Sequence, residues 1–346
     1  MLPYLLVLSF VMFWITLEQK VLNRKSFWLP LIVLALFAGI RSYYVGTDSP
    51  GYVRSFINPL DIGEFKFRDD VEVGYQLLQY SILSLTRNYF WLFFITGLIV
   101  VYCYLKMIKK YSVNYLLSVF LFITLGTYIF FFNGLRQGLA MAIFVLATPY
   151  LLEKRIIPYV LISLLASLFH VSALFMIPFY LLSTIKIKMI YKVLISFFGS
   201  LVSSSFLVSY FAESNQRYEV YTEVSEKPGG LLVLSFFAII MIFIYFISNV
   251  YRIKEENFDR LFTFYAVGVA FIIPVAMLGT NPSGPQRLLT YFIWPLILVL
   301  PIVFKKINNT LFSSLFVGLI LTYFILTVSR FSDLTPYIIN PIFEIF

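Results

Sequence analysis

Residues 114–152 read NYLLSVFLFITLGTYIFFFNGLRQGLAMAIFVLATPYLL, and this stretch decides the fold. Apolar runs at 114–132 and 139–152 flank the polar hexapeptide 133–138, NGLRQG. Runs of about 20 apolar residues are long enough to cross a bilayer as helices. A charged side chain at membrane depth costs roughly 2.5–3.5 kcal/mol on insertion scales, so Arg136 is a candidate functional residue.

The composition extends this pattern to the whole chain. Of its 346 residues, 60% are hydrophobic and 12% are charged, whereas globular domains average about 45–50% and about 25%. Only helices and closed barrels satisfy the backbone in lipid, and continuous rather than alternating runs exclude a barrel. We therefore predict an all-α polytopic membrane bundle of about 11–12 transmembrane segments. The expected spans are 2–17, 27–44, 89–107, 113–132, 136–152, 156–169, 171–185, 189–211, 230–250, 260–280, 288–304 and 310–328.

The loop charges predict an orientation. Basic residues gather in alternate loops, at 20–25, 106–110, 154–155, 186–192, 252–260 and 305–306. Because cytoplasmic loops carry an excess of Lys and Arg, we place these loops inside and the N-terminus outside. The net charge of +9 is then a topology signal, and no nucleic-acid partner is expected.

The segment 156–185 is awkward, because about 30 residues are long for one span and short for two. We predict two short half-helices that turn near His170, since a single crossing would move the later basic clusters outside. A long tilted helix is the alternative.

Two substantial loops, 45–88 and 212–229, fall outside in this topology. Residues 72–87 of the first place Tyr75, Leu78, Ile82 and Leu85 on one helical face, which predicts a helix in the outer interface. The inside loops are short and lack a phosphate-binding glycine loop, so ATP-driven activity is not expected. With no repeat or low-complexity linker, 1–346 is predicted to be a single domain.

Several polar residues share the outer side in this topology, and they are the candidate site: Arg41, Asp48, Glu72, Arg136, His170 and Arg287. Each also has a plain structural reading, as a helix-end anchor, a turn or cap residue, or a buried hydrogen-bonding group. Arg136 would lie at the start of a helix, where the helix dipole disfavours a cation, so its position favours a functional role. A helix N-terminus with an arginine beside it suits a bound phosphate. Gly134 and Gly138 would permit close approach, or would form a small-residue packing face.

The scarcity of cysteine and histidine argues against metal chemistry. The chain has one Cys, Cys103, and one His, His170, with no cluster of ligand spacing around them. We therefore predict no disulfide framework, no metal site and no cofactor.

Four short motifs occur in a characteristic order: Arg41 with Gly46-Thr47-Asp48 and Tyr52, then 72–75 (EVGY), 136–140 (RQGLA) and 169–174 (FHVSAL). Over about residues 35–300, the chain resembles the EpsG-like family of Wzy-type bacterial polysaccharide polymerases. The resemblance implies an enzyme that joins oligosaccharide repeat units carried on undecaprenyl diphosphate, at the outer face of the bacterial cytoplasmic membrane. The resemblance implies that this reaction needs neither a nucleotide sugar nor ATP.

The resemblance also assigns roles to residues. Arg41, Arg136 and Arg287 would bind the diphosphate, and the planar guanidinium fits it bidentately. The general base would be Asp48, Glu72 or His170, and the sequence does not choose among them. Sugar contacts would come from Tyr52 and Tyr75. Implied partners are the lipid-linked oligosaccharides, the bilayer, and a chain-length regulator and flippase of the same pathway.

Three other functions stay open at this point. A flippase for lipid-linked sugars would also present cations to a diphosphate, but it should open to both sides. A membrane O-acyltransferase would use His170 as base, and a structural assembly subunit would need no site. The polymer itself is open among O-antigen, capsule and biofilm exopolysaccharide.

Overall fold

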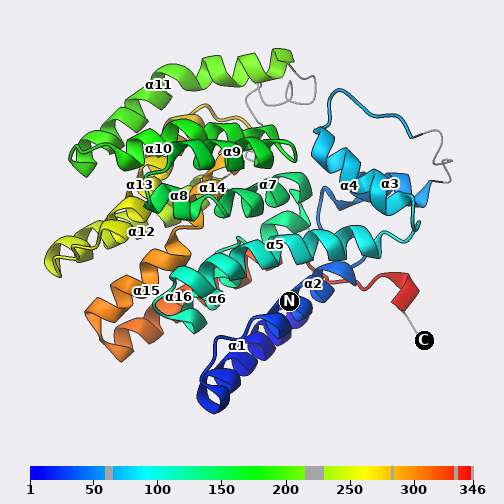
Figure 1. The fold of residues 1–346 in the computed structure, drawn as a ribbon, viewed down its shortest axis with the longest axis horizontal. Helices are drawn as coiled ribbons and strands as arrows, with labels where there is room; N and C mark the ends of the chain where they lie inside the picture. Colours follow the sequence, from blue (N-terminus) through cyan, green and yellow to red (C-terminus); the bar gives the residue numbers. More distant parts are fainter. Residues whose placement is uncertain (59–64, 215–229, 282–283, 331–333, 344–346) are drawn as a thin grey trace. The chain divides into compact units, whose positions relative to one another are not determined.

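The computed structural model describes residues 1–58, 65–214, 230–281, 284–330 and 334–343 (Figure 1). Within these ranges the chain forms helices and short 3-10 turns, with no strand beyond one isolated bridge between Arg41 and Ile339. Seven of the described helices are long and apolar enough to cross a membrane, or eight if the bent pair 285–293 and 296–307 is one span. The predicted all-α polytopic bundle is confirmed. Four further apolar helices are shorter than predicted, at 28–39, 135–145, 156–167 and 171–184.

The residue contacts divide the chain into two compact units. Unit 1 comprises residues 1–147, 162–173 and 309–346, and unit 2 comprises 148–161 and 174–308. The single-domain prediction for 1–346 stays a prediction. Unit 1 contains α1 (Leu2–Leu22), α2 (Trp28–Gly39), α3 (Ser49–Ile57), α4 (Val73–Leu83), α5 (Phe90–Tyr111), α6 (Tyr115–Thr124), η2 (Ile129–Phe132), α7 (Leu135–Val145), α16 (Thr310–Arg330) and η6 (Pro341–Phe343).

Helix α5 forms the middle of unit 1, where it contacts both α2 and α7. Small residues allow α2 to approach closely, because a Cβ added at Gly97 would lie 3.2 Å from Ala35. Lys25 before α2 donates from Nζ to the backbone oxygen of Lys109 at 2.9 Å, near the end of α5. The predicted inside loops 20–25 and 106–110 therefore lie at the same end of unit 1.

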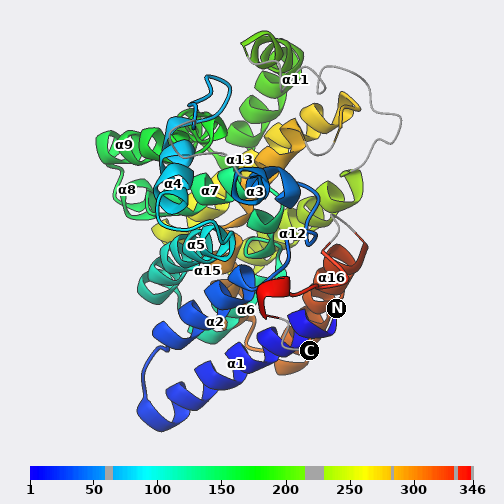
Figure 2. The ribbon, with the colours of Figure 1, turned by 90° about the vertical axis from the view of Figure 1, so that its right-hand side faces the viewer.

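The C-terminal segment 334–343 packs on α1 and α2 of the same unit (Figure 2). Ser42 donates its backbone N–H to Ile338 at 2.8 Å, and Asn340 donates to Ile40 at 2.8 Å. The ring of Tyr337 stacks on Phe37 with centroids 4.4 Å apart. This segment thus covers the backbone around Arg41, a role that no motif predicted.

Helix α13 (Glu256–Met277) is the centre of unit 2 and contacts most of its helices. Two serines of α11 donate to its backbone, Ser196 to Val267 at 2.7 Å and Ser200 to Phe271 at 2.6 Å. Such bonds join helices where water is absent. The remaining elements are α8 (Thr148–Leu152), the start of α9 (Ile156–Ser167), α10 (Met176–Thr184), α11 (Met189–Ser214), α12 (Leu231–Val250), η5 (Pro285–Leu288), α14 (Leu289–Ile293) and α15 (Leu296–Ile307).

Three of the predicted inside loops meet at one end of unit 2. Lys154 pairs with Glu256 at 3.0 Å, and Lys306 pairs with Glu255 at 3.9 Å. The loops at 153–155, 251–256 and 305–306 therefore share a side, as the charge pattern requires. Which side of a membrane that is stays a prediction.

The turn near His170 is confirmed. Tyr159 on α9 donates to the backbone oxygen of Met176 at 2.9 Å, and its ring lies 4.9 Å from that of Tyr180. In one straight helix, 21 residues would separate Tyr159 from Tyr180 by about 31 Å. The chain must therefore turn back between them, after α9 and before the 3-10 helix η3 (Val171–Phe175).

The outer loop 45–88 differs in detail from the prediction. It contains α3, which the sequence pattern did not indicate, and its second helix, α4, ends at Leu83 rather than near Arg87. Leu85, predicted on the apolar face, lies beyond the helix and is 87% exposed. Gln76 on α4 is buried, and its side-chain amide forms hydrogen bonds with the backbone of Arg68 and Val71 in the preceding loop. The second predicted loop, 212–229, lies almost entirely outside the described residues.

Candidate active site

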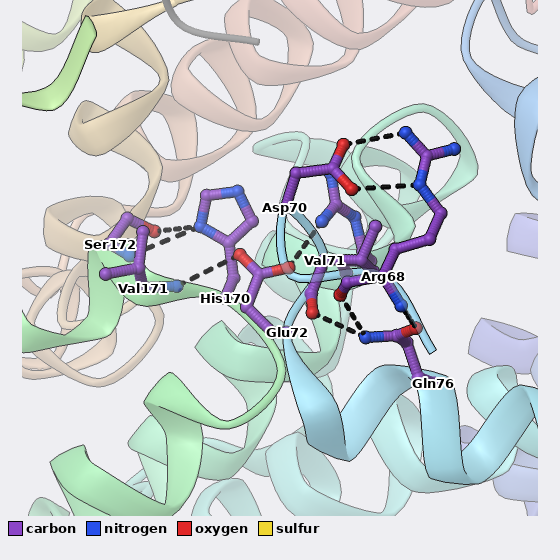
Figure 3. Close-up of polar contacts among 9 residues, drawn as sticks. Arg68, Asp70, Val71, Glu72, Gln76, His170, Val171 and Ser172 are labelled. Carbon is purple, nitrogen blue, oxygen red and sulfur yellow. Dashed lines mark hydrogen bonds and ion pairs between the residues drawn. The ribbon is translucent and has the colours of Figure 1, made fainter. Parts of the chain in front are cut away.

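An ion pair between Glu72, which is labelled in Figure 3, and Arg136 is the centre of the site. Glu72 immediately precedes α4, and Arg136 lies in the first turn of α7. Nη1 of Arg136 contacts Oε2 of Glu72, and the two side chains are only 15% and 13% exposed. The structure thus brings together two predicted site residues that are 64 positions apart.

The second carboxylate oxygen of Glu72 faces the turn that carries His170. Oε1 accepts the backbone N–H of Val171 at 3.3 Å. The two segments are also joined beside Glu72, where Gly74 donates its N–H to the backbone oxygen of Leu168 at 2.8 Å. Three segments of unit 1, at 72–74, 136 and 168–172, therefore meet at Glu72.

Gly74 is required for this close approach. A Cβ built on it would lie 2.7 Å from the Leu168 oxygen and 3.0 Å from the Leu168 Cβ. We predict that Gly74→Ala lowers the free energy of unfolding by about 1–3 kcal/mol, because backbone must shift to make room. The matched control is Gly51→Ala on α3, where a Cβ meets nothing within 4 Å and alanine should be neutral or slightly stabilising. Thermal unfolding in detergent compares them, and equal midpoints for both variants would contradict the prediction.

His170 is tied into its own turn through Nδ1. That atom lies 2.7 Å from Oγ of Ser172 and accepts the Ser172 backbone N–H at 3.3 Å. Because Nδ1 accepts a backbone hydrogen, the neutral imidazole carries its own hydrogen on Nε2. In this tautomer His170 is a hydrogen-bond donor at Nε2.

Arg41 lies in unit 1 but is directed into the protein. Its side chain is fully buried, and Nη1 donates to Val45 O at 2.5 Å, Ser49 Oγ at 2.7 Å and Phe132 O at 3.2 Å. The guanidinium lies over the rings of Phe93 and Phe132, at 3.9 and 4.5 Å from their centroids. The buried guanidinium thus connects the 45–49 turn to the segment that leads to Arg136.

Asp48 belongs to that 45–49 turn. The hydroxyl of Thr47 lies 3.4 Å from Oδ1 of Asp48 and 3.2 Å from Oδ1 of Asn133, three residues before Arg136. Gly46 has a φ of +100°, and a Cβ there would lie 2.7 Å from the Phe132 oxygen. The turn is therefore pressed against 132–133, and only glycine fits at 46.

The predicted tyrosines lie together. The rings of Tyr52 and Tyr75 are 5.9 Å apart in an edge-on arrangement, and Gln79 donates to the Tyr52 backbone oxygen at 3.4 Å. Tyr75 is only 3% exposed, whereas Tyr52 is half-buried. Of the two, Tyr52 is the better placed to reach a sugar.

Arg287 belongs to unit 2, in η5, where its backbone N–H bonds Gly284 at 3.0 Å. Its predicted role at the diphosphate stays a prediction.

The two glycines of the hexapeptide 133–138 serve local packing. A Cβ on Gly138 would lie 2.3 Å from the Phe131 Cβ, and a Cβ on Gly134 would lie 2.9 Å from the Phe130 ring. In the described part of the chain no three His, Cys, Asp or Glu side chains are grouped as metal ligands.

Sequence reasoning missed the groups that position Glu72, His170 and Arg41. These groups are Gly74, the Val171 amide, Ser172 and the Phe132 carbonyl. The backbone groups carry no sequence signal. Ser172 and Gly74 were within the recognised motifs, at 169–174 and 72–75, without a role.

Fold and site together define a polytopic helical membrane protein with a partly buried carboxylate–guanidinium pair in one unit. The chain belongs to the EpsG family, a Wzy-like polymerase family, whose sequence model matches residues 25–339. No curated protein and no solved structure matches the chain.

Proposed function

We propose that this protein is a polymerase that joins undecaprenyl-diphosphate-linked oligosaccharide repeat units at the outer face of the bacterial cytoplasmic membrane. Membership of the EpsG family supports the polymerase class. The single observation that carries the substrate is the Glu72–Arg136 pair, since a partly buried arginine already bound to an anionic oxygen suits a diphosphate. The basic loops that share one end of each unit support an outward-facing site.

The reaction is a glycosyl transfer between two lipid-linked chains. A hydroxyl at the non-reducing end of one unit attacks the anomeric carbon of the growing chain. A new glycosidic bond forms, the bond from that carbon to the diphosphate oxygen breaks, and undecaprenyl diphosphate leaves with the electron pair. The hydroxyl proton passes to a base. Arg136 stabilises the charge that develops on the leaving diphosphate.

The other predicted residues take supporting parts. His170 donates Nε2–H to a diphosphate oxygen, which the bonding of Nδ1 to Ser172 favours over a role as base. Asp48 and Glu72 are then the candidate bases. Arg41 positions the turn that carries Asp48, and Tyr52 contacts a sugar. Arg287 is proposed as a second cation for the diphosphate.

The pathway around the enzyme follows from its substrate. A flippase would deliver the lipid-linked units to the outer face, and a chain-length regulator would set the size of the product. The product would be an O-antigen, capsule or secreted exopolysaccharide.

Reconstitution tests this proposal. Purified protein in liposomes, given undecaprenyl-diphosphate oligosaccharide and no nucleotide sugar, should produce a ladder of chains that grow by whole repeat units. Protein-free liposomes are the control. Movement of the lipid-linked unit between leaflets without elongation would contradict the proposal and identify a flippase.

A further inference from the structure

We propose that the Glu72 carboxylate occupies the position that an anionic oxygen of the lipid diphosphate takes at Arg136, and that Glu72 becomes the general base once the diphosphate displaces it. This inference rests on the polymerase function proposed above. It identifies the base, which neither the motifs nor the family assigns.

The donors around Glu72 are those that a phosphate requires. Nη1 of Arg136 contacts one carboxylate oxygen. The Val171 N–H donates to the other oxygen at 3.3 Å (Figure 3). Carboxylate and phosphate oxygens accept the same charge-assisted bonds from a guanidinium. A diphosphate oxygen can therefore replace a Glu72 oxygen without any new donor.

Because the ion pair is largely buried, the Glu72 carboxylate leaves Arg136 only when another anion takes its place. Arg136 and Glu72 are 15% and 13% exposed. Removing one partner from a buried ion pair is strongly destabilising, because it leaves a charge without compensation. Arg136 therefore releases Glu72 when another anion arrives, and the diphosphate is that anion.

The backbone around Glu72 is anchored on both sides, so the side chain can move alone. On the N-terminal side, the Gln76 amide donates to Arg68 O at 2.8 Å and Val71 O at 2.6 Å, and its oxygen accepts the Arg68 N–H at 2.7 Å. On the C-terminal side, Gly74 bonds Leu168 at 2.8 Å. Rotation of the Glu72 side chain breaks none of these bonds.

The exchange also frees the Glu72 carboxylate at the right time. While Glu72 is bound, its two oxygens accept from Arg136 and from the Val171 N–H, and once it is displaced they can accept a proton instead. With the diphosphate on Arg136, Glu72 takes the proton of the acceptor hydroxyl while that oxygen bonds to the anomeric carbon. The bond from this carbon to the diphosphate breaks, and the electron pair leaves with undecaprenyl diphosphate. Base activity therefore requires a bound donor.

Binding of undecaprenyl diphosphate to the purified full-length protein in detergent tests the exchange. Glu72→Gln keeps an acceptor for Val171 but removes the competing charge, so we expect about ten-fold tighter binding than wild type together with loss of elongation. The matched control is Asp70→Asn, two residues before Glu72. This change removes the carboxylate that pairs with the exposed guanidinium of Arg68. Its affinity and elongation should equal those of wild type.

A second measurement uses the wild-type protein and does not depend on a variant that folds. Carbodiimide labelling of Glu72, read by mass spectrometry, should increase when undecaprenyl diphosphate binds, because the carboxylate is released. Unchanged or reduced labelling would overturn the exchange, as would equal or weaker binding by Glu72→Gln. Elongation by Glu72→Gln at the wild-type rate would overturn the role as base.

These outcomes are distinct from failure of the proposed function. If wild type elongates chains but Glu72→Gln binds no tighter, the exchange is wrong and the polymerase stands. If wild type never elongates chains, the polymerase is wrong, and the affinity and labelling results still decide whether Glu72 and a diphosphate compete for Arg136.

Discussion

Arg136→Ala is expected to abolish elongation, with a loss of at least about 100-fold in rate, as for removal of a donor to a developing anion elsewhere. Among the described residues, Arg136 is the cation that pairs with Glu72, so its loss removes that partner from the leaving diphosphate. Arg136→Lys keeps the charge but not the planar fork, and we expect an intermediate rate. The measurement is the chain-length ladder from reconstituted protein.

Two controls separate chemistry from folding in this experiment. Alanine at 136 also leaves Glu72 without its cation, which destabilises the protein. The double variant Glu72→Gln, Arg136→Ala removes both charges and should regain thermal stability, which tests the folding effect alone because Glu72→Gln by itself should abolish elongation. Arg68→Ala, at an arginine that is 63% exposed, should leave elongation intact. Long chains from Arg136→Ala at normal protein level would refute the assignment.

Arg41→Ala is expected to lower the free energy of unfolding by about 3–5 kcal/mol, as for truncation of a large, fully buried side chain that leaves a cavity. Its guanidinium donates to Val45, Ser49 and Phe132 and packs on two rings, so alanine removes the donor to the Val45 oxygen and leaves a cavity beside the rings. The Phe132 oxygen keeps the Ser49 hydroxyl as a donor. Arg41→Lys should be intermediate, because an ammonium cannot both cover the rings and reach three acceptors. Thermal unfolding in detergent measures the loss.

The comparison for Arg41 is again Arg68→Ala, which breaks an exposed pair with Asp70 and should cost no more than about 1 kcal/mol. Elongation by Arg41 variants should fall in proportion to the folded fraction. If instead Arg41→Lys unfolds like wild type but no longer binds undecaprenyl diphosphate, Arg41 contacts the substrate directly and its structural role is secondary.

The membrane fold could be predicted because hydropathy is a local property. Each of the twelve apolar runs corresponds to a helix or a pair of helices among the described residues. The turn near His170 followed from length and charge together, since about 30 residues cannot form two full spans and a single crossing would move the later basic clusters outside. Helix α3 was missed because Ser49, Pro50 and Gly51 are turn-forming residues, although Val53 and Phe56 are buried on one of its faces.

The site could be predicted in its residue types but not in its geometry. Polar residues in apolar surroundings identified Glu72, Arg136 and His170 as candidates. Nothing in the chain order indicates that Glu72 contacts Arg136, because that contact forms only when the residue before α4 reaches the first turn of α7 in the folded chain. Nor does it indicate that Arg41 is directed inward, since this depends on the rings of Phe93 and Phe132.

The amino-acid sequence by itself determined the class of this protein, its helical spans, the turn at His170 and the set of polar residues available for chemistry. These follow from the free energy of moving side chains and backbone into lipid, which each segment largely settles alone. The tertiary structure decided which arginine is buried and which is paired, and that the Glu72 carboxylate is bound to Arg136 and the Val171 amide. Such contacts depend on the approach of distant segments to within a few ångströms, which no single segment specifies.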